Sequence, residues 1–301
     1  MSEKTSIGLS KALKREAGIG ILFASPWIVG FLVFTLYPIL SSLFYSFTNY
    51  NTFNSPKWIG LNNFIAIFKN PDFYKALTNT LFYVVISVPL NLVLGVLIGL
   101  LLAQKAFGVR LYRTIYYLPN VLSVVAVSFL WKLLFDPNGP INRILEAFGI
   151  KTPPIWLADS AYVKPAIIIM GAWGVGATVI IFLAAIKGVP SVLYEAAVID
   201  GAGPLTRFRV ITLPAISPTI YFNLIMGIIG SFQSFLTAYI MVGGGPNKAS
   251  YFYGQLVYEM AFRDNRMGYA SALSWILLLI ILAITVVAIK SSSRMVVYFD
   301  A

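Results

Sequence analysis

The sequence predicts an all-α, polytopic membrane protein with six transmembrane helices, and its composition and charge pattern carry this prediction. Only 33 of the 301 residues are charged, 58% are hydrophobic, and the mean hydropathy is +0.81, which is unlike a soluble domain. A bilayer core of roughly 30 Å needs about 20 helical residues, and backbone polar groups in lipid must be paired within the segment. Six runs of at least 18 residues contain no charge: residues 17–56, 76–104, 114–131, 165–186, 210–247 and 267–289.

Within these runs the helices are expected at about residues 18–42, 78–103, 114–135, 165–187, 217–242 and 270–289. The basic start of the chain resembles that of a signal peptide, but the uncharged run that follows is 40 residues long and shows no cleavage site, so we expect an uncleaved first span. Prolines and glycines interrupt the spans. They fit close helix packing or a water-filled cavity: Pro26, Pro38, Pro89, Pro119, Gly171, Gly174, Gly176, Gly227 and Gly230.

The distribution of basic residues predicts that both termini lie in the cytoplasm. With that orientation the inner segments hold 12 of the 22 Lys and Arg residues in a shorter total length than the outer loops. The same orientation is favoured by the basic residues of the inner segments that lie close to span ends, where the positive-inside effect is strongest. These residues are Arg15, Lys105, Arg110, Arg113, Lys187 and Lys290. The net charge of +11 fits membrane orientation and anionic lipid better than nucleic acid.

Several functional classes are disfavoured by what the sequence lacks. The absence of Cys and His excludes structural disulfides, thiolate or imidazole metal sites, a Ser-His-Asp triad and histidine proton relays. No ionisable residue lies in the middle of a span, since Lys132 beside Trp131 can reach the outer headgroups. The Gly243-Gly244-Gly245-Pro246 cluster is not a phosphate-binding loop. If the protein moves a solute uphill, the energy must come from a partner.

The segment between the fourth and fifth spans has an unusually ordered pattern. Pro190 or Ser191 can start a helix, Glu195-Ala196-Ala197 continues it, and Gly201 with Gly203-Pro204 ends it. A second short helix is expected at about residues 205–211.

This segment has the residues and the spacing of a known signature: Glu195-Ala196-Ala197, Gly201, Ile211 and Leu213-Pro214. The pattern resembles the loop of the inner-membrane permeases of binding-protein-dependent ABC importers, and the fuller form is similar to their carbohydrate branch, of the maltose or glycerol-phosphate type. Other matching stretches are Pro26-Trp27, Leu36-Tyr37-Pro38, residues 58–64, Leu118-Pro119-Asn120, residues 231–235 and 243–246.

In that family the loop couples the permease to an ATPase. The resemblance implies this role for Tyr194, Glu195, Ala196, Ala197, Asp200, Gly201, Ala202 and Gly203. An ordinary cytoplasmic hairpin would explain Glu-Ala-Ala alone.

The resemblance implies the type I ABC importer permease fold, in a prokaryotic plasma (inner) membrane. Residues 1–75 would form the N-terminal tail, first helix and first outer loop, residues 76–290 the core with its coupling loop at 188–214, and residues 291–301 a cytoplasmic tail. The implied partners are a second related permease, a cytoplasmic ATPase dimer that holds ATP and magnesium, and an extracytoplasmic solute-binding protein that touches loops such as 136–164 and 243–266. The chain itself is expected to need no cofactor and to be no enzyme.

The solute is expected to pass along the fourth and fifth spans, where polar and small residues interrupt apolar runs. Aromatic faces, amides and hydroxyls bind sugars, and the candidates are Trp173, Gly174, Thr178, Gly230, Ser231, Gln233 and Ser234. Maltose-binding relatives have tyrosine and asparagines where this chain has Thr178, Ser231 and Ser234, so the solute or the partner's share of binding can differ. Hydrogen bonds between helices are the alternative role for Gln233 and the serines. A sugar, an oligosaccharide or a polyol phosphate would fit.

Two other classes of membrane protein fit the sequence less well. An ion-coupled carrier is disfavoured by the missing intramembrane carboxylate and by the absence of a visible internal repeat. An intramembrane enzyme or a channel would need a nucleophile, a base, a metal-ligand set or a charged ring, and no candidate is present.

Overall fold

The computed structural model describes residues 16, 19–104 and 108–292, and the regular secondary structure of this part of the chain is helical, apart from a single bridge between Thr48 and Trp58. The all-α prediction is confirmed. The basic N-terminal residues, Lys105 and residues 293–301 of the predicted tail (291–301) lie outside the described residues. The chain divides into two compact units, one formed by residues 1–66 and 260–275, the other by residues 67–259 and 276–301.

Three described helices are individually long and apolar enough to cross a membrane: Ile19–Ser46, Pro71–Ala103 and Met267–Ser291. Three bent pairs raise the number to six when each pair counts as one span. The pairs are Val109–Asn120 with Val124–Leu134 (101°), Val163–Trp173 with Gly176–Lys187 (46°), and Pro204–Ala215 with Ser217–Gln233 (63°). Each of the six overlaps one of the uncharged runs.

The smaller unit is held together around residues 42–63 and the start of the last helix. The Asn63 side-chain amide donates to the carbonyls of Ser46 (2.9 Å) and Thr48 (2.8 Å). A Cβ at Gly268 would collide with the Thr48 carbonyl, so only glycine fits there. The helices that lie wholly or partly in this unit are η1 (Leu32–Leu36), α2 (Tyr37–Ser46), α3 (Asn62–Lys69), η4 (Glu259–Arg263) and α16 (Met267–Ser292).

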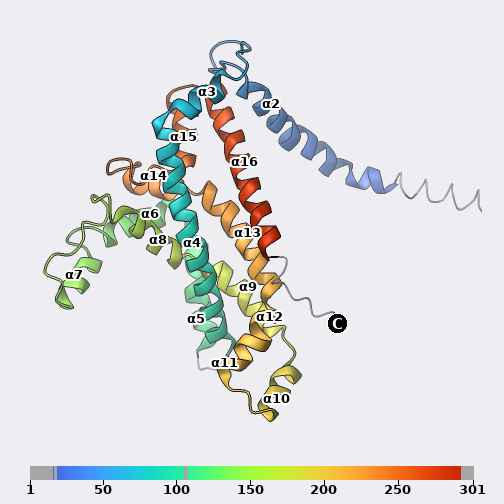
Figure 1. Cartoon of the computed structure of the whole chain (residues 1–301), viewed down its shortest axis with the longest axis vertical. Coiled ribbons are helices and arrows are strands. Elements are labelled where there is room, and N and C mark those ends of the chain that lie inside the picture. The colour runs from blue at the N-terminus through green and yellow to red at the C-terminus, as the bar shows by residue number, and fades with distance from the viewer. Residues whose placement is uncertain (1–15, 17–18, 105–107, 293–301) are drawn as a thin grey trace, which may run out of the picture. The chain divides into compact units, whose positions relative to one another are not determined.

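The larger unit is organised around α4 (Pro71–Ala103), which packs mainly against α8, α9, α13 and α15 of the same unit. Figure 1 shows α4 running the length of this unit, with α10 and α11 near the end where α4 stops. The further elements are α5 (Val109–Tyr117), η2 (Leu118–Asn120), α6 (Val124–Leu134), α7 (Pro140–Ala147), α8 (Val163–Trp173), α9 (Gly176–Lys187), α10 (Ser191–Ile199), α11 (Pro204–Arg207), η3 (Phe208–Thr212), α12 (Leu213–Ala215), α13 (Ser217–Gln233), α14 (Leu236–Val242) and α15 (Tyr253–Tyr258).

Close packing between α4 and α9 depends on two glycines of α4. A Cβ at Gly95 would lie 2.7 Å from the Thr178 methyl and 2.9 Å from the Phe182 ring. At Gly99 it would lie 3.2 Å from Phe182 Cβ. Because small residues let membrane helices approach closely, these glycines bring α4 onto α9, where Phe182 is completely buried.

The second and third spans differ from the expected ranges for identifiable reasons. The second span begins at Pro71 instead of residue 78, because Asn70 caps it by accepting a hydrogen bond from the Asp72 amide (2.9 Å) and Pro71 suits the first helical position. The third span, expected as one helix, divides into α5 and α6. Pro119 lies in the 3₁₀ turn between them, and extended backbone at Ser123 starts α6 in a new direction.

Candidate functional site: the coupling elbow and the broken helices

The predicted coupling segment is a helix, a sharp turn and a second helix. The first helix, α10, ends in a Schellman motif: Gly201 has φ +75°, its amide donates to Val198 O (3.0 Å), and the Ala202 amide donates to Ala197 O (2.8 Å). Gly203 then has extended backbone, and Pro204 starts α11. We call residues 191–212 the coupling elbow. The two predicted helices are confirmed, although the second continues from α11 into the π-helical η3.

The two arms of the elbow face each other across a groove of about 260 Å³. Ala196 and Ala197 lie on the α10 side of this groove, where their small side chains leave it open. A hydrogen bond of 2.9 Å between the Tyr194 hydroxyl and Thr212 Oγ1 joins the arms. The lining residues are Leu193, Ala196, Ala197, Asp200, Ala202, Thr206, Arg207, Val210 and Ile211.

Charged groups lie on and beside this groove. Glu195 and Asp200 are exposed, and Asp200 belongs to the groove lining. The Arg207 Nε atom is buried without a hydrogen-bond partner in the described part of the chain. An acidic rim beside a half-buried arginine offers both signs of charge along one groove.

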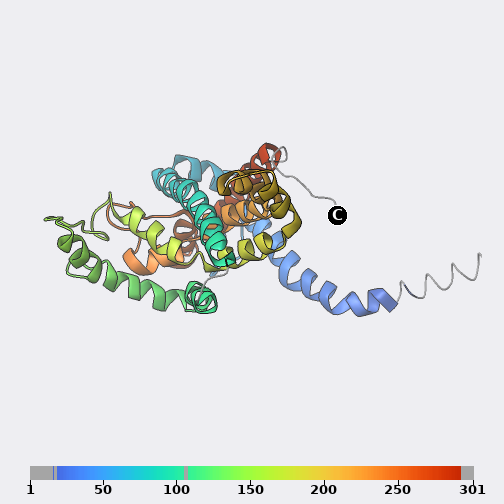
Figure 2. The same cartoon turned by 90° about the horizontal axis from the view of Figure 1, so that it is seen from below.

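The elbow is attached to the membrane-spanning helices by an apolar cluster. Buried Phe182, Ile186 and Ile216 pack with Val189, just before the first arm, and with Phe208 of the second arm. Seen from below, the elbow lies in front of the rest of this unit (Figure 2). A displacement of the elbow would therefore act directly on α9 and on the start of α13.

In the fourth span, the predicted solute-path residues lie at a break. The helix bends by 46° between α8 and α9, and the Gly174 amide donates to Gly171 O (3.0 Å) as the helix stops. Trp173 is 37% exposed and meets Trp131 edge to face, with ring centroids 5.9 Å apart. Thr178 lies in the first turn of α9, and its methyl group packs against Gly95 of α4.

The fifth span also breaks where its polar residues were predicted. Helix α13 ends at Gln233, and Ser234 has extended backbone. Gly230 and Gln233 are exposed, while Ser231 and Ser234 are half-buried. No heavy atom would lie within 4 Å of a Cβ at Gly230, so this face of the helix is open. Phe232 is fully buried in the core and does not share that face.

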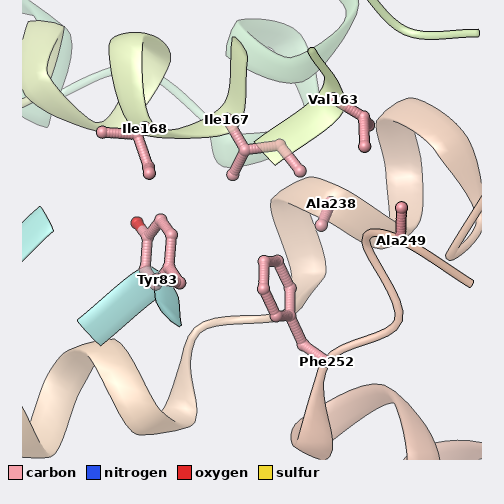
Figure 3. Packing of buried hydrophobic residues seen from close by; sticks show 7 residues of the cluster. All are labelled: Tyr83, Val163, Ile167, Ile168, Ala238, Ala249 and Phe252. Atoms are coloured by element: carbon pink, nitrogen blue, oxygen red, sulfur yellow. The ribbon is translucent and has the colours of Figure 1, made fainter. Parts of the chain in front are cut away.

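A residue that the sequence analysis missed lies where the two spans come together. Tyr83 of α4 is 8% exposed, and its hydroxyl is close to the side chain of Ser234. The same hydroxyl would lie 3.2 Å from a Cβ at Gly171. Figure 3 shows the Tyr83 ring beside Ile168 and Phe252 in the buried cluster that surrounds it. The available signal was the four-residue spacing of Asn79, Tyr83 and Ser87, which places polar groups on one face of an otherwise apolar helix.

The glycine-rich loop after α14 has a tightly fixed backbone. Gly243 and Gly244 both have positive φ, and a Cβ at Gly244 would lie 2.7 Å from the Gln255 side-chain nitrogen. Gln255 is completely buried, and its Nε2 donates to Gly243 O and to Glu259 Oε1, each at 3.0 Å. Among the described residues, no group of three His, Cys, Asp or Glu side chains is placed to hold a metal ion.

Comparison with protein families decides the broad assignment. Residues 95–300 match the model of the binding-protein-dependent transport system inner membrane component. The chain belongs to this family. It is thus an integral membrane permease subunit of a transport system, and the resemblance drawn from the coupling segment is confirmed.

Individual relatives of this permease agree with that assignment over nearly its whole length. It is 39% identical to the probable ABC transporter permease protein YesP of Bacillus subtilis (strain 168), covering 96% of this chain and 95% of the relative. It is 34% identical to the lactose transport system permease protein LacF of Rhizobium radiobacter, covering 90% and 93%.

A solved structure shares the fold. One chain of a bacterial ABC transporter involved in the import of the acidic polysaccharide alginate superimposes with a TM-score of 0.83 at 26% identity, covering 95% of this permease and 99% of that chain. The type I ABC importer permease fold expected from the sequence is confirmed.

Proposed function

We propose that this permease forms half of the translocation pathway of an ATP-driven carbohydrate importer. The observation that carries the proposal is the coupling elbow, a glycine-hinged pair of short helices with an open groove between them. Carbohydrate as the solute is supported by relatives named for lactose, multiple sugars, arabinooligosaccharides and diacetylchitobiose.

The elbow is the proposed docking surface for a cytoplasmic ATPase dimer. Three of its apolar side chains are largely exposed: Val192 is 68%, Ile199 86% and Val210 66% accessible. Apolar patches that face water mark sites of protein association. The contact would be formed by Tyr194, Glu195, Ala196, Ala197, Asp200, Gly201, Ala202 and Gly203. The partner would hold ATP and magnesium, and this chain would supply no catalytic residue.

The movement that ATP hydrolysis drives would be transmitted to the solute path by the packing of the elbow on α9 and α13. Closure of the ATPases moves the elbow, and the elbow tilts the fourth and fifth spans at breaks that lie beside the predicted path residues.

Docking to a cytoplasmic ATPase requires the elbow on the inner side of the plasma membrane. That orientation puts both termini in the cytoplasm, as the basic residues also indicate.

On the outer side, a solute-binding protein would dock on loops that include residues 136–164 and 243–266. Support comes from a solved alginate transporter in complex with an alginate pentasaccharide-bound periplasmic protein, 26% identical to this chain with a TM-score of 0.82. The loop backbone that buried Gln255 fixes gives such a protein a defined surface to recognise.

A second, related permease would complete the path. The residues proposed to face the solute are Trp173, Gly174, Gly230, Ser231, Gln233 and Ser234. Thr178 acts through helix packing against Gly95. The open face at Gly230 and the exposed Gln233 amide suit a hydroxyl-rich solute that meets few charges.

Affinity purification of this chain from its native membrane in mild detergent tests the proposal. We expect an ATPase and a second permease to co-purify. In proteoliposomes with the native binding protein, at least one of lactose, arabinotriose, diacetylchitobiose or an alginate trisaccharide should stimulate ATP hydrolysis. A chain that purifies alone and transports sugar without ATP would contradict the proposal.

A further inference from the structure

Three aromatic rings meet immediately beyond the break in the fifth span. Phe235 follows Ser234, Tyr239 lies one turn later on α14, and Tyr258 ends α15. Ring centroids are 6.5 Å apart for Phe235 and Tyr239, 5.9 Å for Phe235 and Tyr258, and 5.5 Å for Tyr239 and Tyr258. We call these three residues the aromatic triad. Each ring contacts both others, so they form one continuous surface.

The triad is anchored on one side and open on the other. A Cβ at Gly254 would lie 2.7 Å from Phe235 Cδ1, so Phe235 rests directly on the backbone of α15. Phe235 also packs on the buried cluster around Tyr83 that Figure 3 shows. Tyr239 and Tyr258 remain 36% and 39% exposed. Rings held in place before binding lose little conformational entropy when a ligand stacks on them.

The triad lies beside the residues proposed to face the solute. Ser231 and Ser234 precede Phe235 by four residues and one residue, and two further aromatic side chains described near this break, Phe232 and Tyr83, are both buried. On this side of the path, aromatic surface for a solute is therefore supplied by the triad. Hydroxyls next to an aromatic surface provide the mixture of polar and apolar contacts that small-molecule sites use.

We propose that the aromatic triad is a stacking platform for a pyranose ring of the transported carbohydrate. The C–H face of a sugar ring presents weakly positive hydrogens to the negative face of an aromatic ring, while the Ser231 and Ser234 hydroxyls bond to its hydroxyl groups. This inference rests on the proposed function, because it assigns a subsite of the same solute path. Tyr239 and Tyr258 supply the accessible rings, and Phe235 positions them.

Tyr239→Leu and Tyr258→Leu remove each accessible ring in turn, and Tyr239→Phe keeps the ring but removes the hydroxyl. The exposed Phe129→Leu on α6 is the matched control. The assay is uptake of the best-transported sugar of the four-sugar panel into proteoliposomes that contain the whole importer. We expect both Leu variants to lower uptake about fivefold to tenfold, Tyr239→Phe and Phe129→Leu to stay near wild type, and all variants to assemble normally.

The outcomes separate the two proposals. If the wild-type importer responds to no sugar of the panel, the carbohydrate function fails, and the triad inference, which rests on it, is wrong with it. If the wild type responds and both Leu variants take up sugar at the wild-type rate, the rings only contact lipid and the inference is wrong. If the Leu variants lose the second permease during purification, the triad belongs to the subunit interface and the inference is also wrong.

Discussion

The Ala202 amide donates a 2.8 Å hydrogen bond back to the Ala197 carbonyl, across a left-handed Gly201. This bond fixes where α10 stops and in which direction α11 leaves. The geometry of the elbow therefore depends on one glycine that accepts a positive φ. An elbow of defined angle can transmit a displacement, whereas a flexible loop of the same length would absorb it.

Gly201→Ala and Gly203→Ala form a matched pair two residues apart. Neither added Cβ would meet an atom within 4 Å, but only Gly201 has a positive φ. We expect Gly201→Ala to strain the elbow by about 1–2 kcal/mol and to lower sugar-stimulated ATP hydrolysis severalfold. Gly203→Ala, at φ −70° and ψ 169°, adds no backbone strain and should lower the rate less than Gly201→Ala. Equal rates for the two variants would show that the left-handed turn is not needed.

The Tyr194–Thr212 hydrogen bond joins the two arms, and its removal should loosen coupling. Tyr194→Phe and Thr212→Val should each reduce the sugar transported per ATP hydrolysed, since a bond of this kind contributes about 0.5–1.5 kcal/mol. The double variant should be no worse than either single one, because all three lack the same bond. Additive losses in a transport-to-hydrolysis assay would rule out this role.

Gly95→Val tests the packing of α4 on α9. The added side chain would enter the space of the Thr178 methyl and the Phe182 ring, at a cost of about 1–3 kcal/mol. We expect a lower unfolding temperature for the purified complex in detergent. Gly230→Ala is the control, since nothing lies within 4 Å of its Cβ, and it should leave that temperature unchanged. An unchanged unfolding temperature for Gly95→Val would show that α4 and α9 are not closely packed.

Replacement of Ser231, Gln233 or Ser234 by Leu should reduce sugar uptake while the complex still assembles. Gln233 is exposed and the serines are half-buried, so the larger apolar side chain can be accommodated without breaking the core. Uptake into proteoliposomes and the yield of assembled complex are the two measurements. Wild-type uptake in all three variants would assign these residues to helix packing.

Charge pattern and glycine chemistry predict much of this molecule from its sequence. Uncharged runs locate the spans because lipid excludes charges. Gly201 locates the elbow because few other residues accept its φ. The 101° bend after α5 was not predictable from Pro119, because proline is tolerated within straight membrane helices when neighbours re-satisfy the backbone.

Side-chain direction was harder to predict than helix position. Thr178 was expected to face the solute, yet its methyl packs on Gly95, since only the partner helix determines which side of α9 is covered. Tyr83 was missed because a single tyrosine in an apolar helix is equally compatible with the core and with a polar site. In the aromatic triad, Tyr258 lies 19 or more positions from the other two residues in the sequence. The triad could therefore be recognised only once the packing of α14 against the end of α15 was known.

The most direct test of the account is sugar-stimulated ATP hydrolysis by the purified importer with Glu195→Lys in this chain. Glu195 is exposed on α10, so reversing its charge should leave the fold intact while it repels a basic partner group. We predict that the variant reaches the membrane in normal amounts and that the sugar no longer stimulates hydrolysis. Stimulation at the wild-type level would contradict the central claim that this elbow couples the permease to its ATPase.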